Sequence, residues 1–203
     1  IVTQGICDVC AISSGEIEVV LKGTLCTLPS STQIISLNGT SFEEICTEII
    51  NLGELLNVKN AAKEHVGKAM VKKDNLDSLP KYSRKILSLE WIDPYFSAGH
   101  WVPEQIEIAG FRSAIGQRGE PSRVISIEEI IDSDPDDIAV ICCGYKLHEN
   151  ELFAEKLKNN KEINFLKPFK SNKIYSFDSD SYFSRPTTRI IEGAEQLRRS
   201  VLG

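Results

Sequence analysis

Aromatic and titratable side chains are concentrated in residues 90–104, which hold both tryptophans of the chain, Trp91 and Trp101, together with Phe96 and His100. Aromatic faces can stack on flat, apolar ligands, while a histidine or a carboxylate can hydrogen-bond or titrate. The stretch follows an apolar run and ends in a Pro-Glu helix start, which indicates a loop between a strand and a helix. Ligands of open α/β sheets bind just beyond the carboxyl ends of strands, so we interpret this loop as the wall of a ligand site.

A second aromatic stretch, in residues 182–186, contains Tyr182, Phe183 and Arg185 and also follows a predicted strand. A planar guanidinium between aromatic rings can stack on a flat ligand or hydrogen-bond to its amide and carboxylate groups. The alternative is an arginine that caps the turn before a helix. Because two such stretches follow strands of the same half of the chain, we favour ligand binding.

Six cysteines, at positions 7, 10, 26, 46, 142 and 143, raise the alternatives of metal binding and thiol catalysis. Cys7 and Cys10 have C-x-x-C spacing, but one such pair supplies only half of a zinc site. A thiol enzyme would combine Cys10 or Cys143 with His100 as base and Asp93 as its orienting partner. The sequence contains no nucleophile elbow, phosphate loop or Rossmann glycine fingerprint. We therefore expect no enzyme and no bound metal, with mostly free thiols that pack as small hydrophobes.

Composition narrows the class of protein further. The 203 residues suffice for one domain or two small lobes, and the net charge of −6 argues against nucleic-acid binding, which needs a basic face. No segment approaches the length of a transmembrane span. The chain opens at Ile1 in what resembles the middle of a strand, so we expect that residues precede it, together with any targeting segment.

Alternating strand and helix patterns predict an α/β fold with mainly parallel sheets. Two capping boxes, Ser41 to Glu44 and Ser126 to Glu129, mark helix starts. Expected strands span 1–4, 33–37, 85–89, 138–142 and 174–177. Expected helices span 16–22, 42–52, 58–79, 103–109 and 149–158, with further helices from 127 and from about 187.

Four blocks of sequence, at 3–11, 90–104, 143–145 and 182–186, resemble the cobalamin-binding proteins among the class III substrate-binding proteins of ABC importers. This class also serves ferric siderophores and haem. The resemblance implies two Rossmann-like α/β lobes bridged by one long helix. Residues 1–57 would then form a partial N-terminal lobe, 58–80 the bridging helix and 81–203 the C-terminal lobe. The N-terminal lobe is incomplete by comparison, because the family's lobe begins with another βαβ unit.

The resemblance also implies a ligand site facing a corrin, a broad and mostly apolar macrocycle fringed with amides. The N-terminal lobe would contribute Gln4, Cys7 and Cys10. The C-terminal lobe would contribute Trp91, Asp93, Phe96, His100, Trp101, Tyr145, Tyr182, Phe183 and Arg185. Glu128 would present a carboxylate to arginines of a membrane permease; the alternative is a solvated residue beside a capping box.

We therefore predict a monomeric binding protein, without a catalytic cofactor, that delivers cobalamin or a related corrinoid to the permease of an ABC importer. A ferric siderophore or haem receptor is the first alternative, although those ligands favour more basic residues than Arg185 alone. A thiol- or zinc-dependent enzyme using Cys7, Cys10, Cys143 and His100 is the second. The family implies a periplasmic or extracytoplasmic, membrane-associated location, while free cysteines and the lack of a visible signal leave a cytoplasmic one open.

Overall fold

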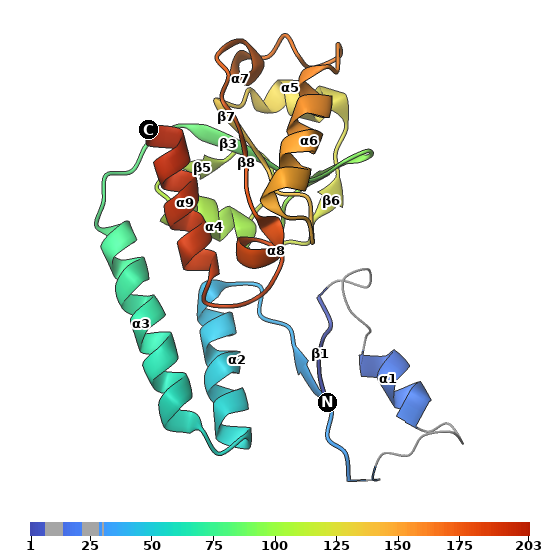
Figure 1. The fold of residues 1–203 in the computed structure, drawn as a ribbon, viewed down its shortest axis with the longest axis vertical. Helices are drawn as coiled ribbons and strands as arrows, with labels where there is room; N and C mark the ends of the chain where they lie inside the picture. Colours follow the sequence, from blue (N-terminus) through green and yellow to red (C-terminus); the bar gives the residue numbers. More distant parts are fainter. Residues whose placement is uncertain (7–13, 22–28, 30) are drawn as a thin grey trace.

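The computed structural model describes residues 1–6, 14–21, 29 and 31–203, and its centre is a mixed sheet of six strands (Figure 1). The sheet order is β6-β4-β3-β7-β8, and β5 also pairs with β3. β3 pairs in parallel with β5 and β7, and β7 with β8, whereas β4 is antiparallel to both β3 and β6. The strands are β3 (Lys85–Ile92), β4 (Tyr95–Ser97), β5 (Arg112–Ser113), β6 (Arg123–Val124), β7 (Asp137–Val140) and β8 (Ile174–Ser176).

Helices cover both faces of this sheet (Figure 1). α4 (Val102–Ile108) and α9 (Ile190–Leu202) pack on one face, and α5 (Ile127–Ser133), α6 (Leu147–Lys158) and α7 (Lys167–Lys170) on the other. Successive strand residues alternate between the two cores, because Ile86 joins the first while Leu87 and Leu89 join the second. Burial on both faces explains why β3 and β7 read as nearly continuous apolar runs.

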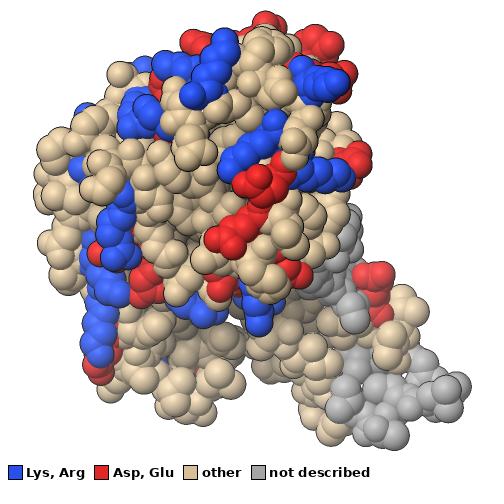
Figure 2. Space-filling model, turned by 45° about the horizontal axis from the view of Figure 1, so that its top comes forward, with Lys and Arg blue, Asp and Glu red and all other residues tan. Residues whose placement is uncertain are grey.

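Two long helices, α2 (Phe42–Leu55) and α3 (Lys59–Asp77), pack against the first of these cores. Phe42 and Ile45 of α2 are buried in the same cluster as Val66 and Leu76 of α3 and the side chains of α4 and α9. The solvent side of α3 carries lysines, and Figure 2 shows basic side chains along the side of the molecule where α3 lies. α3 falls within the range predicted for the bridging helix, while the division into lobes stays a prediction.

A carboxylate of α4, a helix that packs on the large sheet, caps the start of α2. The predicted box is present, with Ser41 accepting from the Glu44 N–H. In addition, the buried Glu104 of α4 accepts a hydrogen bond from the Phe42 N–H at 2.7 Å. This N–H belongs to the first turn of α2, where backbone donors have no partner within the helix. Glu104 therefore fixes the start of α2 against α4.

A small parallel sheet of β1 (Val2–Gln4) and β2 (Ile35–Leu37) lies apart from the large sheet, beside α1 (Ser14–Leu21) (Figure 1). The turn after β2 connects it to α2. The Asn38 side chain accepts from the Gly5 N–H at 2.9 Å, and Glu48 of α2 accepts from the backbone of Asn38 and Gly39. Within the described ranges, no helix combines the length and apolar character needed to cross a membrane.

The prediction of a loop throughout residues 90–104 was wrong. β3 continues to Ile92 and turns back into β4, with Trp91 opposite Phe96 and Ile92 opposite Tyr95. Aromatic and β-branched side chains favour extended backbone, and the Asp-Pro pair between them favours the turn. Four short elements were also missed, namely β5, β6, α7 and α8 (Ser179–Tyr182), because their length leaves little periodic pattern.

We expect Glu104→Ala to lower the free energy of unfolding by about 2–3 kcal/mol, because the buried Phe42 N–H would lose a charged acceptor. Glu107→Ala, on the same helix but with an exposed side chain paired to Arg118, should cost less than about 1 kcal/mol. Urea denaturation of both variants measures the difference. Equal losses in the two variants would contradict the capping role.

Candidate functional site

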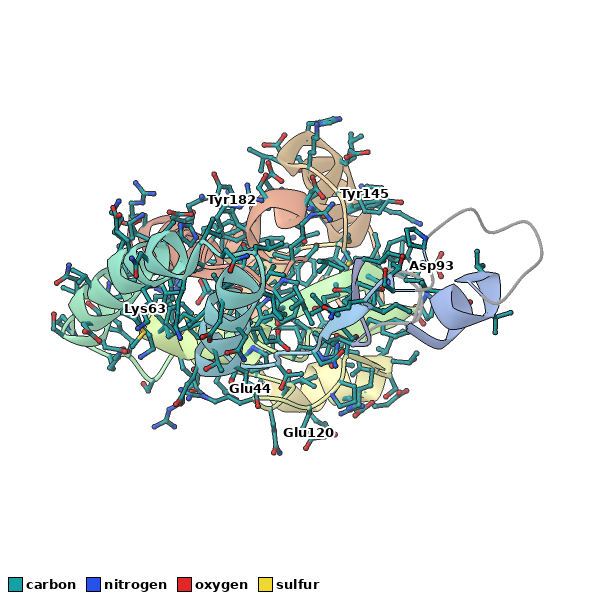
Figure 3. All side chains as sticks on the ribbon, turned by 90° about the horizontal axis from the view of Figure 1, so that it is seen from below. Glu44, Lys63, Asp93, Glu120, Tyr145 and Tyr182 are labelled. Carbon is teal, nitrogen blue, oxygen red and sulfur yellow. The ribbon has the colours of Figure 1, made fainter. Side chains whose placement is uncertain are left out.

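Parallel pairing brings the carboxyl ends of β3, β7 and β8 to one edge of the sheet. The segments at this edge are residues 90–97, 141–145 and 177–185, which we call the carboxyl edge. They carry most of the predicted C-terminal ligand residues. Figure 3 shows Asp93, Tyr145 and Tyr182, one from each segment, on the side of the molecule away from Glu44 and Glu120. The sheet topology therefore gathers residues that are far apart in the sequence.

An aromatic pair lies at the centre of the carboxyl edge. The rings of Trp91 and Tyr145 have centroids 5.7 Å apart, and Trp91 is 37% exposed. The Trp91 ring N–H donates to the Asp93 carbonyl at 2.9 Å, and Tyr145 packs edge-on against Phe153 of α6. These contacts hold a ring of β3 and a ring of the segment after β7 in place, with one aromatic surface accessible, as a flat ligand requires.

Hydrogen bonds join the segments that follow β7 and β8. The Ser184 hydroxyl accepts from the Gly144 N–H at 2.9 Å, and the Tyr145 carbonyl accepts from the Asp180 N–H at 3.0 Å. Arg185 is exposed and forms an ion pair with Asp180 at 2.6 Å. The carboxyl edge is thus one connected structure, in which the charge of Arg185 is offset by a neighbouring carboxylate.

Trp101 and Phe183, both predicted to contact a ligand, are buried in the core at 5% and 2% exposure. The Trp101 ring N–H donates to the Phe183 carbonyl at 2.9 Å. The Gln105 amide donates to the carbonyls of Tyr182 and Ile190 at 3.0 and 2.8 Å. These bonds hold the segment after β8 against α4, so in this structure Trp101 positions the carboxyl edge. Direct contact of either ring with a ligand stays a prediction.

The structure does not place His100 beside the Trp91–Tyr145 pair. His100 follows β4 and Tyr145 follows β7, with β3 between these strands. The His100 backbone has a φ of 54° and donates to the Glu120 carbonyl at 2.6 Å. Its ring Nδ1 is buried with no hydrogen-bond partner among the described residues, and burial lowers the pKa of the imidazole. The neutral ring is therefore favoured.

The remaining predicted residues occupy varied surroundings. Phe96 is half-buried in β4, and Gln4 is half-buried at the end of β1. Cys7 and Cys10 lie outside the described residues. Cys143 is half-buried on the carboxyl edge. Within the described part of the chain, no group of three or more His, Cys, Asp or Glu side chains could hold a metal ion.

Glu128 is exposed in the first turn of α5. Backbone hydrogen bonding at the helix start and the Ser126 hydroxyl lower the pKa of its carboxyl, so it is charged at neutral pH. Its neighbour Glu129 completes the predicted capping box and pairs with Arg123 at 2.7 Å. Glu128 is thus available to a partner, as the docking prediction requires.

Sequence reasoning missed two polar residues that organise the carboxyl edge. Asn150 is fully buried; its carbonyl oxygen accepts from the Cys142 N–H at 2.9 Å, and its amide donates to the Phe177 carbonyl at 2.8 Å. Glu90 accepts a hydrogen bond from the Ser122 hydroxyl, and burial raises the pKa of its carboxyl to about 7. Asn150 stands between two glutamates and has no sequence signal, while the only signal at Glu90 is a carboxylate between apolar neighbours.

The large sheet has helices on both faces and adjoins a smaller sheet and a long helical pair. Aromatic and polar residues gather at the carboxyl ends of its strands, the place where ligands bind in α/β proteins. A sequence profile of the family described as periplasmic binding protein matches residues 13–181. The chain therefore belongs to the periplasmic binding protein family. This family consists of solute-binding proteins, which are not enzymes. No curated protein matches the sequence significantly.

Several solved structures share this fold. An ABC transporter substrate-binding protein from Listeria monocytogenes has a TM-score of 0.77 and 18% identity, over 92% of this chain and 72% of that one. A possible iron-binding protein from Staphylococcus epidermidis has a TM-score of 0.70 and 22% identity, over 85% and 67%. The periplasmic vitamin B12 binding protein of Vibrio cholerae has a TM-score of 0.62 and 16% identity, over 85% and 66%.

These likenesses confirm the predicted class III fold, and at such identities they establish the fold alone. The chain spans between 62% and 72% of the length of the first three structures that it matches. Other similar structures include a Staphylococcus aureus protein complexed with haem and a Fe³⁺-hydroxamate transport protein from Saccharomonospora viridis. The choice of ligand therefore depends on this chain's own residues.

We expect Trp101→Phe to lower the free energy of unfolding by about 1–2 kcal/mol, because the buried Phe183 carbonyl would lose its donor while the aromatic volume is largely retained. Trp91→Phe removes an equivalent bond at the surface and should change stability by less than about 0.5 kcal/mol. Chemical denaturation compares the two. A loss in Trp91→Phe as large as in Trp101→Phe would refute this assignment.

Glu90 should make stability depend on pH. In the folded protein its pKa is about 7, whereas an exposed glutamate titrates near 4.5. Between these values the folded state holds a proton that the unfolded chain has released, so stability falls as pH rises from about 4.5 to 7. Glu90→Gln should remove this fall and gain up to about 3 kcal/mol over the wild type between pH 4.5 and 8.

The measurement is a series of urea denaturations across that pH range. Glu120→Gln, which neutralises an exposed carboxyl, serves as the control and should keep the wild-type profile. Parallel profiles for the wild type and Glu90→Gln would show that the Glu90 pKa is not raised.

Proposed function

We propose that this protein is the substrate-binding component of an ABC importer and that it binds cobalamin or a related corrinoid at the carboxyl edge. The observation that carries the proposal is the accessible aromatic pair, Trp91 and Tyr145, at the centre of that edge. A corrin is broad, mostly apolar and fringed with amides. Aromatic surface with a few hydrogen-bonding groups around it suits such a ligand.

The charges of the carboxyl edge support a corrinoid over an anionic iron chelate. Within this edge Arg185 is the only described lysine or arginine, and Asp180 already pairs with it. Beside the edge, Lys156 of α6 pairs with Asp93 at 3.7 Å, and the exposed Lys146 follows Tyr145. Haem propionates and anionic siderophores would need unpaired cations to offset their charge. An amide-fringed macrocycle needs hydrogen-bonding groups instead, which Tyr145, Tyr182 and the exposed backbone can supply.

In this proposal the predicted residues divide into two groups. One group contacts the ligand directly, from the C-terminal lobe at 81–203 and the partial N-terminal lobe at 1–57: Gln4, Cys7, Cys10, Trp91, Asp93, Phe96, His100, Tyr145, Tyr182 and Arg185. Trp101 and Phe183 form the other group and hold the edge in shape from the core. The helix within 58–80 connects the lobes.

Delivery of the ligand would use the permease as partner. Glu128 is exposed, charged and at a helix start, which suits docking to an arginine of a membrane protein. The binding protein would act as a monomer and hold the corrinoid non-covalently, with no catalytic cofactor.

A haem- or iron-chelate-binding protein of the same fold is the second candidate. The observation that favours it is the half-buried imidazole of His100, whose pKa is lowered by burial, since neutral imidazole is a common ligand of iron. In that case haemin should bind with a shift of its Soret band that is lost in His100→Ala.

Titration calorimetry of the full-length protein with cyanocobalamin tests the first candidate. We expect micromolar or tighter binding, weakened about tenfold or more by Trp91→Ala because the central aromatic contact is lost. Phe165→Ala is the matched control, since Phe165 is a similarly exposed ring that precedes the amino end of β8. Haemin binding without cyanocobalamin binding would move the assignment to the second candidate.

A further inference from the structure

Glu90 lies at an irregularity in β3, beside the carboxyl edge's aromatic pair. Leu89 pairs with Ser97 and Trp91 with the preceding residue of β4, Phe96, so Glu90 is an extra residue of β3 without a pairing partner. Such β-bulges re-aim side chains and are over-represented next to functional sites. The bulge leaves Trp91 exposed while the neighbouring Glu90 is half-buried.

Glu90 is hydrogen-bonded through both its side chain and its backbone to segments that are distant in the sequence. Its carboxyl accepts from the Ser122 hydroxyl, which in turn accepts from the Gly99 N–H at 3.1 Å. Its backbone carbonyl accepts from the Cys143 N–H at 3.0 Å. A side chain at Gly99 would meet the Ser122 backbone at 2.3 Å, so the two segments are in close contact. Glu90 therefore links the loops after β4, after β7 and before β6.

The surroundings of the carboxyl disfavour its charge. Among the described residues no lysine, arginine or histidine forms an ion pair with Glu90. The titratable groups that face it are thiols: Cys142, whose pKa is raised by burial above all and also by the charges of Cys143 and Glu90, and Cys143 on the adjoining backbone. A carboxylate without a cation in a poorly hydrated site readily takes up a proton. The Ser122 and Gly99 donors oppose this by favouring the charged form.

We propose that Glu90 is a positioning residue of the ligand site whose neutral, protonated form is the one that binds ligand best. A flat, apolar ligand seated on Trp91 and Tyr145 would exclude water from the adjoining bulge, whose backbone is bonded to the segment that carries Tyr145. Losing that water penalises the carboxylate much more than the carboxylic acid, which is uncharged and can keep its bond to Ser122. Ligand binding would then be accompanied by proton uptake, and affinity would fall as pH rises through the neutral range. This inference rests on the proposed function.

Calorimetry of the full-length protein with cyanocobalamin, from pH 5.5 to 8.5, tests it. The wild type should lose about fivefold to tenfold in affinity across this range, and heats measured in two buffers of different ionisation enthalpy should show net proton uptake near pH 7. Glu90→Gln keeps the shape of the neutral acid, so it should bind with a flat pH profile and no proton uptake. Glu120→Gln should behave as the wild type.

Ser122→Ala provides a second, directional test. Without the hydroxyl that favours the carboxylate, the loss of affinity should move to higher pH. Binding with the same pH profile in the wild type, Glu90→Gln and Ser122→Ala would overturn the role of Glu90 and leave the proposed function intact. Absence of cyanocobalamin binding at every pH would overturn both.

Discussion

Parallel pairing of β3, β7 and β8 is the constraint on which the rest of this structure depends. Parallel strands end at the same edge of a sheet, so the segments that follow them must meet there. In this chain those segments carry Trp91, Tyr145 and Tyr182, which are separated by many residues in the sequence. The two cores on either face of the sheet hold the strands in this order, and the aromatic surface of the carboxyl edge follows from that packing.

Buried polar groups then give the carboxyl edge its shape. Asn150, Gln105 and the Trp101 ring each donate to backbone carbonyls at the ends of β8 or α8, where no strand or helix partner is available. A buried backbone group without a partner is costly, so these side chains define one arrangement of the loops. The result is an aromatic surface on a fixed support, as preorganised binding of a flat ligand requires.

The helical pair α2–α3 packs against the helices of the large sheet and shares their hydrophobic core. Its apolar side chains share the core of α4 and α9, and Glu104 caps α2 across that contact. The small β1–β2 sheet is connected to this helical pair through the turn after β2, where Asn38 and Glu48 form the polar contacts.

The sequence by itself determined the longer local elements and the family. Both capping boxes, the apolar runs of β3 and β7 and the amphipathic face of α9 depend on contacts within a few residues, so pattern alone predicts them. Tertiary structure decided which aromatic rings are accessible. Trp91 and Trp101 have similar sequence surroundings, yet one lies at the surface and the other in the core, because long-range packing of α4 and α8 buries Trp101. The hairpin and the bulge at Glu90 likewise depend on pairing with β4 and on Ser122, partners that no local pattern specifies.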